Sequence, residues 1–517
     1  MDRKYAILLI AVLAVTLHFC LIQRQGLWVD EISSLARATG HSLEHPASGA
    51  NPAEGDYQET SSAHEPEYWR RYLQHDSPPS SVSRLIRGIF LSDTNPPLYY
   101  ILLHCWTRIC GTGDVSLRLF SVLCSLICIP LMWSLGRQTA GFHGGVLAAL
   151  FFALAPIGIY YSIEGRMYSL LWLELLAATW CTIRLQTQGW KPLTALCCIL
   201  AGSAALLTHY YAVFVWPVLL LWGTARPGVA SRRSFLWIGL ITLALVLPWY
   251  ALVPESFARW RVTGEWLRQP SSLKTILIAP FQLCRRMISP MVLGPHQLLL
   301  DLLIGIAVIG TLVTAVKHKL FLKTWSSELW IWLWILFACA GPSIQDLLLQ
   351  TSASTERRYG LQGFPAVQLF LAMGMTRMKP YLRRVLLVAL LTGYSSGIWA
   401  LFYAPVREQR NFRELGAQLT SWFQPGDVLI VHSIPQGVLA TARYVNAPLP
   451  IAAWTGQLSR RKVPDDIERF AAGKKRIALL KIHDLDEDAP EEIWLRQHRK
   501  LLGHQKGKGF ELLVFGR

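Results

Sequence analysis

Residues 6–31 read AILLIAVLAVTLHFCLIQRQGLWVDE, an apolar run that leads to the adjacent carboxylates Asp30 and Glu31. The run from Ala6 to Ile22 approaches the length of about twenty residues that crosses a bilayer as a helix. A chain that leaves the membrane there exposes both carboxylates to water, where ionisation costs little. Because an ionised carboxylate can act as a base toward a water-soluble acceptor, this pair is the first candidate site.

The composition is that of a membrane protein. Hydrophobic residues make up 52% of the 517-residue chain, charged residues only 16%, and there are 21 tryptophans. The net charge of +17 does not predict nucleic-acid binding, because the cations fall in short clusters between apolar runs. The cysteines lie in or beside these runs, which predicts neither a disulfide framework nor a zinc site. No small-residue cleavage site precedes Trp28, so we expect the first run to be retained.

Runs long enough to span a bilayer recur along the chain. They lie at residues 5–22, 116–136, 143–161, 168–187, 192–208, 235–253, 297–316, 328–349 and 385–404, with two shorter runs at 210–224 and 361–376. The apolar piece 96–110 is too short to span and is typical of an interfacial or re-entrant helix. If it does not cross, the loops rich in lysine and arginine share the side of the amino terminus. The positive-inside rule then predicts about eleven transmembrane helices, with the amino terminus inside and the carboxyl terminus outside.

Two parts are predicted to lie outside the membrane. The first extracytoplasmic loop, residues 23–96, carries a stretch at 45–66 that we expect to be flexible, then an amphipathic helix at 67–74. The carboxyl-terminal part has the pattern of a small α/β domain. We expect strands at 427–431, 476–480 and 511–515 and helices at 412–423, 467–472 and 491–501. The predicted division is a transmembrane domain, residues 1–404, and a soluble extracytoplasmic domain, residues 405–517.

The predicted topology gathers polar motifs on the outer face, where the positive-inside rule should leave arginine scarce. Arg118, Arg166 and Arg358 all fall on this face, so they need a reason to be there. A phosphate is a natural partner, because the guanidinium fork matches its oxygens.

Six motifs carry a resemblance to a known family. They are Trp28-Val29-Asp30-Glu31, Asn95-Pro96-Pro97-Leu98-Tyr99-Tyr100, Ser116-Leu117-Arg118-Leu119-Phe120-Ser121, Tyr161-Ser162-Ile163-Glu164-Gly165-Arg166-Met167-Tyr168, Thr208-His209-Tyr210, and Arg358-Tyr359 with Pro365. In this order they resemble the bacterial branch of glycosyltransferase family 39. These are GT-C membrane glycosyltransferases, related to protein O-mannosyltransferases and to the aminoarabinose transferase of lipid A. The resemblance covers roughly residues 5–404, and Asn95 departs from the lysine of the lipid A enzyme.

The resemblance implies a sugar donor carried on polyprenyl phosphate. It also implies inverting transfer to an acceptor hydroxyl on a glycan, lipid or protein, at the periplasmic face of the bacterial inner membrane. Asp30 matches the catalytic base, with Glu31 supporting it or orienting the acceptor. The candidates for binding donor phosphate or substrate are Arg118, Glu164, Arg166, Tyr168, His209, Tyr210, Arg358 and Tyr359. No metal site is predicted and no cofactor is certain, although Asp30, Glu31 and His209 leave a divalent cation open.

Simpler interpretations stand beside these roles. Arg118 also suits an interfacial arginine that snorkels at a helix end, and His209 suits a satisfied interfacial histidine. Glu164 and Arg166 could pair with each other, and the tyrosines fit an aromatic belt.

Two other functions compete with glycosyl transfer. One is a transporter or flippase of lipid-linked precursors, and the other is a non-glycosyl ligase of lipid-linked polymers. A transporter commonly has internal repeats and charges near the bilayer midplane, which this sequence lacks. A ligase would not need Asp-Glu directly after the first span.

Overall fold

The computed structural model describes residues 3–43, 50–92, 95–225, 228–258, 267–288, 328–403, 411–455, 461–482, 489–507 and 509–517, with individual residues between 302 and 316. The chain forms two compact units. The helical unit comprises Met1–Ile22, Arg118–Val253 and Trp266–Val406, and the loop–sheet unit comprises Gln23–Leu117, Pro254–Glu265 and Arg407–Arg517.

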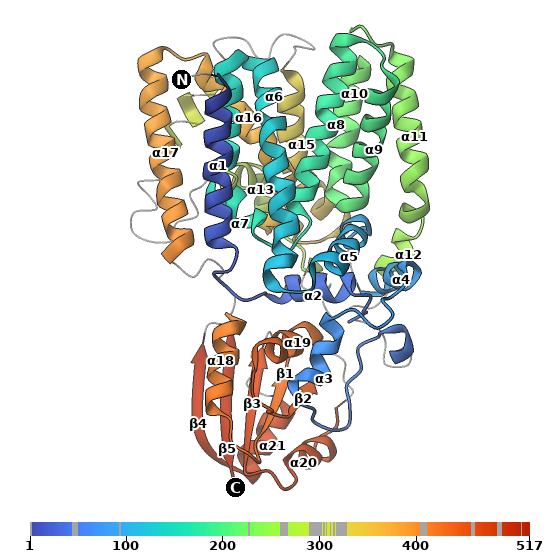
Figure 1. Cartoon of the computed structure of the whole chain (residues 1–517), viewed down its shortest axis with the longest axis vertical. Helices are drawn as coiled ribbons and strands as arrows, with labels where there is room; N and C mark the ends of the chain where they lie inside the picture. The colour runs from blue at the N-terminus through green and yellow to red at the C-terminus, as the bar shows by residue number, and fades with distance from the viewer. Residues whose placement is uncertain are drawn as a thin grey trace. The chain divides into compact units, whose positions relative to one another are not determined.

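The helical unit is built from long apolar helices (Figure 1). Its helices are α1 (Arg3–Leu21), α6 (Asp114–Leu154), α7 (Pro156–Ser162), α8 (Tyr168–Gln188), α9 (Pro192–Thr208), α10 (Trp216–Ala225), α11 (Arg232–Tyr250), α12 (Val253–Ala258), α13 (Leu273–Arg286), α15 (Leu329–Leu349), α16 (Phe364–Thr376) and α17 (Pro380–Tyr403), with α6 and α12 crossing the unit boundaries. Short 3₁₀ turns join them at η4 (Tyr210–Phe214), η6 (Ala353–Thr355) and η7 (Arg357–Gly363).

Helix α6 is two helices rather than one. Its path breaks at Ala140 and Gly141, and Gly141 has a φ of 69°, which an L side chain rarely adopts. The two arms then approach closely, because a Cβ on Gly136 would lie 2.6 Å from the Gly144 carbonyl oxygen. This break separates the runs predicted at 116–136 and 143–161.

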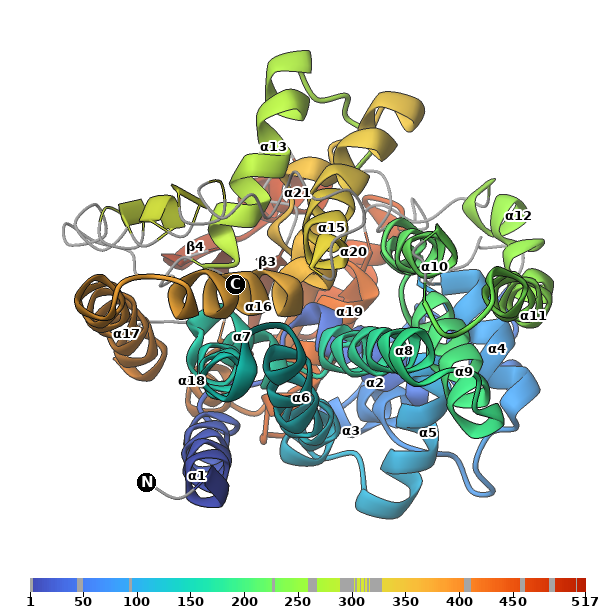
Figure 2. The same cartoon turned by 90° about the horizontal axis from the view of Figure 1, so that it is seen from above.

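Neighbouring helices pack through large buried side chains. Helices α8, α9, α10 and α11 lie together, and α15 packs against α10, α13 and α16 (Figure 2). Gly202 on α9 allows Trp216 to approach, because a Cβ there would lie 2.4 Å from the indole ring. Trp172, Trp216 and Trp334 are fully buried, so these rings fill much of the core.

The described part of the chain contains four helices long and apolar enough to cross a membrane by length and composition. They are Asp114–Leu154, Arg232–Glu255, Leu329–Leu349 and Pro380–Tyr403, and shorter apolar helices cover Tyr5–Leu21, Pro192–Thr208 and Tyr210–Ala225. Eleven spans therefore stay a prediction. Most of the run at 297–316 and the basic residues Arg226, Lys317, Lys319 and Lys323 lie outside the described residues.

The first loop is more structured than expected. It contains α2 (Val29–Ala38), η2 (Pro52–Glu54), α3 (Pro66–Arg70), η3 (Arg71–Leu73) and α4 (Val82–Ser92), and α5 (Leu98–Cys110) follows it. The stretch predicted to be flexible is ordered where it is described. Arg87 forms an ion pair of 2.8 Å with Asp56, and His64 pairs with Ile451 in an isolated bridge. Helix α5 has 13 residues, or about 20 Å, which is short for a span.

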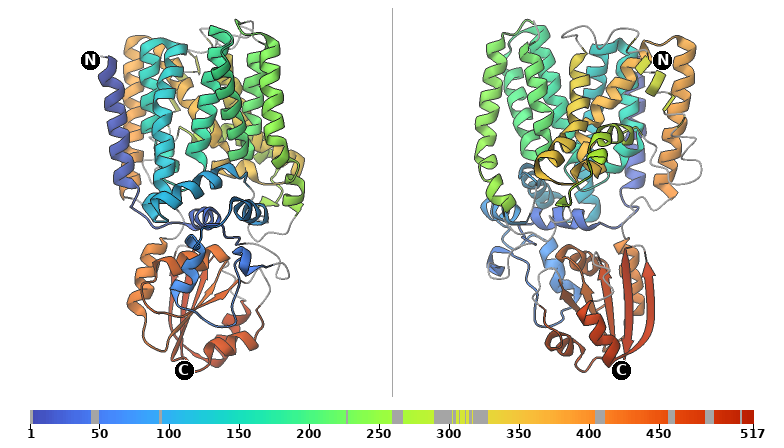
Figure 3. Two further views of the ribbon diagram at one scale, coloured as in Figure 1. Left: turned by 45° about the vertical axis from the view of Figure 1, so that its right-hand side comes forward. Right: turned by 180° about the vertical axis from the view of Figure 1, so that it is seen from behind.

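The carboxyl-terminal part is a five-stranded sheet in the order β2-β1-β3-β5-β4 (Figure 3). Its strands are β1 (Val428–His432), β2 (Ile451–Trp454), β3 (Arg476–Ile482), β4 (Lys500–Gly507) and β5 (Phe510–Gly516), and its helices are α18 (Phe412–Trp422), α19 (Pro435–Tyr444), α20 (Asp465–Ala471) and α21 (Pro490–His498). Strands β1, β2 and β3 are parallel, while β5 and β4 add antiparallel pairs. Ile430, Leu479 and Phe515 lie in the core.

The three predicted strands and the helices at 412–423 and 467–472 are confirmed. The helix predicted at 491–501 is wrong at its end, because Lys500 begins β4. The predicted helix at 67–74 is present as α3 followed by η3. Residues 23–117 share a compact unit with the carboxyl-terminal segment. The domain boundary at residue 404 stays a prediction.

Candidate active site

The candidate residues fall in both units. Asp30 and Glu31 belong to the loop–sheet unit. The helical unit holds the other eight, which are Arg118, Glu164, Arg166, Tyr168, His209, Tyr210, Arg358 and Tyr359.

Three predicted aromatic residues converge in the helical unit. The ring centroid of His209 lies 6.1 Å from Tyr168 at the start of α8 and 6.5 Å from Tyr359 in η7. Tyr211, which the sequence interpretation did not select, stacks on Tyr359 at 4.9 Å and lies 5.3 Å from His209. Elements distant in sequence therefore meet in one aromatic cluster, which we define as Tyr168, His209, Tyr211 and Tyr359.

A local hydrogen bond fixes the ring of His209. The backbone N–H of Tyr211 donates to His209 Nδ1 at 3.2 Å and so caps η4. A ring that accepts at Nδ1 carries its proton on Nε2 when neutral. The hydrogen-bonding need of His209 Nδ1 is therefore met within the protein, as expected for an interfacial histidine whose bonds are satisfied.

Arg358 places a cation against the aromatic cluster. Its guanidinium carbon lies 5.5 Å from the Tyr359 ring centroid, and its Nε lies 4.0 Å from Glu356. The side chain is 21% exposed. A guanidinium on an aromatic face that still reaches solvent can bind an anion.

Arg118 and Arg166 are buried instead. Arg118 is 2% exposed, and its Nη1 donates to the Ile22 carbonyl at 2.9 Å. The Arg166 carbonyl accepts from Ser121 at 3.0 Å, which ties the 163–167 turn to α6. The guanidinium of Arg118 thus lies inside the protein, unlike that of an arginine that snorkels toward water.

Glu164 and Tyr210 differ in their surroundings. Glu164 is 1% exposed, and its carbonyl accepts from the backbone N–H of Arg166 at 2.7 Å. The Tyr210 hydroxyl accepts from Trp249 at 3.1 Å, and its ring meets Tyr250 edge-on at 5.8 Å. These contacts direct the Tyr210 side chain toward α11, whereas Tyr211 enters the aromatic cluster.

Asp346 holds the segment that carries Arg358, although it was not selected from the sequence. Its carboxylate accepts from the backbone N–H groups of Ala353 and Ser354 at 2.7 and 2.8 Å, and from the Thr351 hydroxyl at 2.6 Å. Arg286 adds a bond to the Thr355 carbonyl at 2.8 Å. The sequence signal that could have identified Asp346 was its position as a single acidic residue within an apolar run.

Asp30 and Glu31 occupy the first turn of α2, where the positive end of the helix dipole favours negative charge. They are not equivalent. Glu31 is fully buried, and its carboxylate accepts from the backbone N–H of Trp28 at 3.2 Å in a capping box. Asp30 is partly exposed, and its carbonyl accepts from Ser34 at 2.9 Å. Glu31 thus has a structural task, and Asp30 retains contact with solvent.

The carboxyl-terminal segment supports the start of α2. The backbone N–H of Leu27 donates to the Tyr444 hydroxyl at 2.6 Å, and that hydroxyl donates to Asp114, also at 2.6 Å. Burial raises the pKa of Tyr444, which keeps the hydroxyl protonated as a donor. Further along α2, Ser33 accepts from Gln436 at 3.2 Å. Helix α19 therefore holds α2 at two points.

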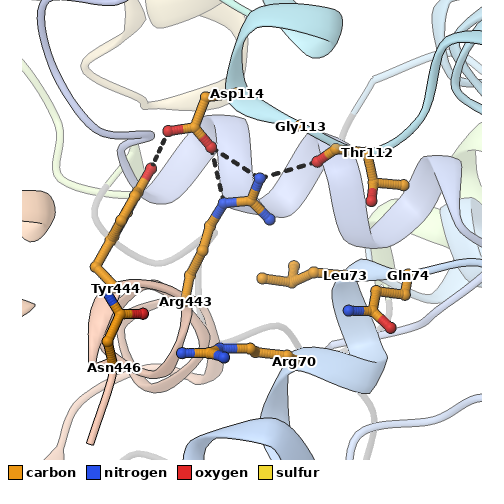
Figure 4. A pocket seen from close by; sticks show the side chains of 9 residues that line it. All are labelled: Arg70, Leu73, Gln74, Thr112, Gly113, Asp114, Arg443, Tyr444 and Asn446. Atoms are coloured by element: carbon orange, nitrogen blue, oxygen red, sulfur yellow. Dashed lines mark hydrogen bonds and ion pairs between the residues drawn. The ribbon is translucent and has the colours of Figure 1, made fainter.

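Asp114 is the centre of a charged network. Arg443 and Arg413 donate to its carboxylate at 2.9 and 2.8 Å, and Arg443 also donates to the Thr112 carbonyl at 2.8 Å. A cavity of about 430 Å³ opens beside this network (Figure 4). Its lining comprises Arg70, Leu73, Gln74, Thr112, Gly113, Asp114, Arg443, Tyr444 and Asn446. Arg70 and Arg443 use most of their side-chain N–H groups in hydrogen bonds to neighbouring residues of the protein. We therefore assign this cavity a structural role.

Metal binding has no clear ligand set. Among the residues that the structure describes, no three histidine, cysteine, aspartate or glutamate side chains gather as a metal site.

Comparisons with known proteins support the family resemblance. Residues 94–251 match the family described as dolichyl-phosphate-mannose-protein mannosyltransferase. This segment contains six of the candidate residues, from Arg118 to Tyr210. No curated protein sequence matches the chain.

Solved structures that match the chain include AglB and ArnT. The archaeal oligosaccharyltransferase AglB from Archaeoglobus fulgidus, in complex with an inhibitory peptide and a dolichol-phosphate, is 14% identical. The match has a TM-score of 0.52 and covers 92% of this chain and 69% of that one. ArnT from Cupriavidus metallidurans, bound to undecaprenyl phosphate, is also 14% identical. Its TM-score is 0.46, with 99% and 98% of the two chains covered. The chain thus has a fold similar to that of AglB, and its residues 94–251 match the model of the dolichyl-phosphate-mannose-protein mannosyltransferase family.

Proposed function

We propose that this protein is an integral-membrane glycosyltransferase that moves a sugar from a polyprenyl-phosphate carrier to an acceptor hydroxyl. The observation that carries the proposal is the segment 94–251, which matches the family and contributes Tyr168 and His209 to the aromatic cluster. Arg358 and Tyr359 reach the same cluster from outside the matched segment. The family match and the aromatic cluster therefore share two residues, Tyr168 and His209.

The chemistry requires one base and one anion site. Asp30 takes the proton from the acceptor hydroxyl, whose oxygen then bonds to the anomeric carbon. The bond between that carbon and the carrier phosphate breaks, and polyprenyl phosphate leaves with the electron pair. A phosphate departs without an acid to protonate it, so a second carboxylic acid is not needed. A single displacement of this kind inverts the anomeric configuration.

Two features of α2 suit Asp30 to the role of base. It is partly exposed, and it lies on a helix whose amino-terminal end is fixed by the Glu31 cap and by Tyr444. Because the backbone that carries Asp30 is held in place, the carboxylate stays oriented toward an acceptor hydroxyl that binds there. Glu31 serves the reaction through this cap, which keeps α2 in place.

The arginines do for the leaving phosphate what a general acid would otherwise do, because they stabilise its negative charge. Arg358 stabilises the charge that grows on the departing phosphate, since its side chain is partly exposed and its guanidinium lies against the Tyr359 ring. Buried Arg118 and Arg166 contribute positive potential, and the Arg166 carbonyl, which accepts from Ser121, ties the turn between α7 and α8 to α6. We place the reaction at the extracytoplasmic face of the membrane, as the positive-inside rule predicts. The family resemblance implies that this membrane is a bacterial inner membrane.

A donor panel tests the proposal. The purified full chain is incubated in membrane vesicles with labelled polyprenyl-phosphate mannose, glucose, galactose and aminoarabinose, and release of polyprenyl phosphate is measured. We expect one donor to be consumed by the wild-type chain and to remain intact with Asp30→Asn. Consumption of none of the donors, or equal consumption by both proteins, would contradict the proposal.

A further inference from the structure

A second cavity lies in the helical unit, at the end of the first arm of α6 that is remote from Arg118. It has a volume of about 410 Å³ and opens beside the break at Gly141. Its lining comprises Trp133, Ser134, Arg137, Gln138, Thr139, Ile183, Arg184, Thr187, Gln188 and Trp330. Helices α6 and α8 are joined at this level by a bond of 2.9 Å from Trp180 Nε1 to Ser134. The cavity is therefore formed where the end of the first α6 arm meets the end of α8.

Two guanidinium groups face this cavity on aromatic supports. The guanidinium carbon of Arg137 lies 5.3 Å from the Trp133 ring centroid, and that of Arg184 lies 4.2 Å from Trp180. Both arginines are exposed, and neither forms an ion pair with a residue that the structure describes. Stacking on an indole restrains the guanidinium plane and leaves its N–H edge available to an anion.

The rest of the lining also suits an anion. None of the described residues that line the cavity is acidic. Lys191 brings a third cation close, because its Nζ donates to Gln188 at 3.1 Å. Two uncompensated guanidinium groups beside one cavity repel each other, and a bound phosphate would relieve that repulsion.

The helix dipole explains only part of the placement of these arginines. Cations are favoured near the carboxyl ends of helices, and Arg184 lies in the last turns of α8. That effect requires neither a shared cavity nor stacking on two tryptophans. The arrangement is built for a ligand as well as for the helix dipole.

The position favours a lipid as the source of the phosphate. Arg118 and Arg137 are nineteen residues apart on one arm of α6, or about 28 Å, which is close to the thickness of the bilayer hydrocarbon core. The cavity thus lies about one hydrocarbon thickness from Arg118, where lipid headgroups of the opposite leaflet would be found. Basic pockets between helices at the cytoplasmic surface bind anionic headgroups.

We propose that Arg137 and Arg184 bind a phosphate group, supplied by the headgroup of an anionic phospholipid. The inference is independent of the transferase activity, since it concerns the end of the first α6 arm that is remote from Arg118. Phosphate from a soluble anion would meet the same two guanidinium groups, so the test must separate the two sources.

Lipid retention by the purified full chain tests the proposal. The protein is delipidated in a neutral detergent and titrated with phosphatidylglycerol or phosphatidylcholine, and bound lipid is counted by native mass spectrometry. We expect saturable binding of phosphatidylglycerol that falls at least fivefold in Arg137→Gln/Arg184→Gln. The matched control is Arg383→Gln/Arg384→Gln, which removes two charges from α17 and should bind as wild type does. Equal binding by the two double variants would overturn the proposal.

Two further arms exclude trivial outcomes. Arg137→Lys/Arg184→Lys keeps the charge but not the fork, so we expect partial retention if the site recognises phosphate geometry. An excess of inorganic phosphate should leave lipid binding largely unchanged, and displacement of the lipid by phosphate would reassign the source to a soluble anion and overturn the lipid assignment. Elution volume and melting temperature establish that each variant is folded.

Discussion

Arg358 and Asp30, one candidate residue from each unit, differ in how their side chains are supported. In the helical unit, Arg358 rests on Tyr359 and keeps a fifth of its side chain exposed. In the loop–sheet unit, the helix that carries Asp30 is fixed by a capping box, by Tyr444 and by Gln436. The difference fits a division of labour. A phosphate on a long flexible carrier can be captured by groups that adjust, whereas a base must meet one hydroxyl in one geometry.

The largest effect is expected from removing the base. Asp30→Asn changes little volume but cannot accept the acceptor proton, so we expect turnover to fall by about 10²–10⁴-fold. Donor binding should remain within about twofold, because the change leaves Arg358 and the aromatic cluster intact. Donor binding and turnover are measured on the same preparation. Turnover near the wild-type level would remove Asp30 from the mechanism.

Arg358 should rank second. Arg358→Ala removes a charge that faces the departing phosphate, and we expect a loss of about 10²-fold in kcat/KM with weaker donor binding. Arg358→Lys restores charge without the planar fork and should recover only part of the loss. Equilibrium binding of labelled donor separates the effects. Wild-type affinity in the alanine variant would exclude Arg358 as a phosphate ligand.

Tyr444 tests how firmly α2 must be held. Tyr444→Phe keeps the ring but deletes the hydroxyl that links Leu27 to Asp114, at a cost of about 1 kcal/mol. We expect kcat to fall by about fivefold, with the KM for donor unchanged, because alignment is lost and donor contacts are not. Tyr68→Phe, which removes a hydroxyl from α3 in the same unit, is the control. Equal kinetics in the two variants would mean that α19 does not position the base.

The smallest effect separates the two neighbouring carboxylates. A glutamine at position 31 can still accept the Trp28 N–H in a capping box, so Glu31→Gln should retain activity within about threefold. Glu31→Ala loses the cap and should lower the melting temperature, in line with a loss of about 1 kcal/mol. Thermal unfolding and turnover are compared across both variants. A large loss of turnover with normal stability in Glu31→Gln would give Glu31 a chemical role.

Apolar length predicted much of the fold. The helices α1, α8, α9, α11, α15 and α17 lie close to the predicted runs, and the polar residues around Gly141 correctly divided α6. Strand β4, KLLGHQKG, was missed because it is largely exposed and lacks an apolar alternation. Strand β2 has only four residues, too few for a reliable pattern.

The candidate site was less accessible from the sequence. The aromatic cluster was partly predicted, since His209, Tyr168 and Tyr359 lie in motifs, but Tyr211 was passed over for its neighbour Tyr210. The cap by Glu31 was hidden because its partner is Trp28, whereas the recognisable box begins with serine or threonine. The bond from Tyr444 to Asp114 joins residues 330 positions apart, a separation that local patterns do not register.

The most direct test of the mechanism is the anomeric configuration of the transferred sugar. The purified protein is supplied with the donor that it consumes, and the product linkage is assigned by nuclear magnetic resonance against the known configuration of the donor. A single displacement aided by Asp30 predicts an inverted linkage throughout the early time course. A retained linkage would require a covalent sugar–enzyme intermediate and would contradict the account.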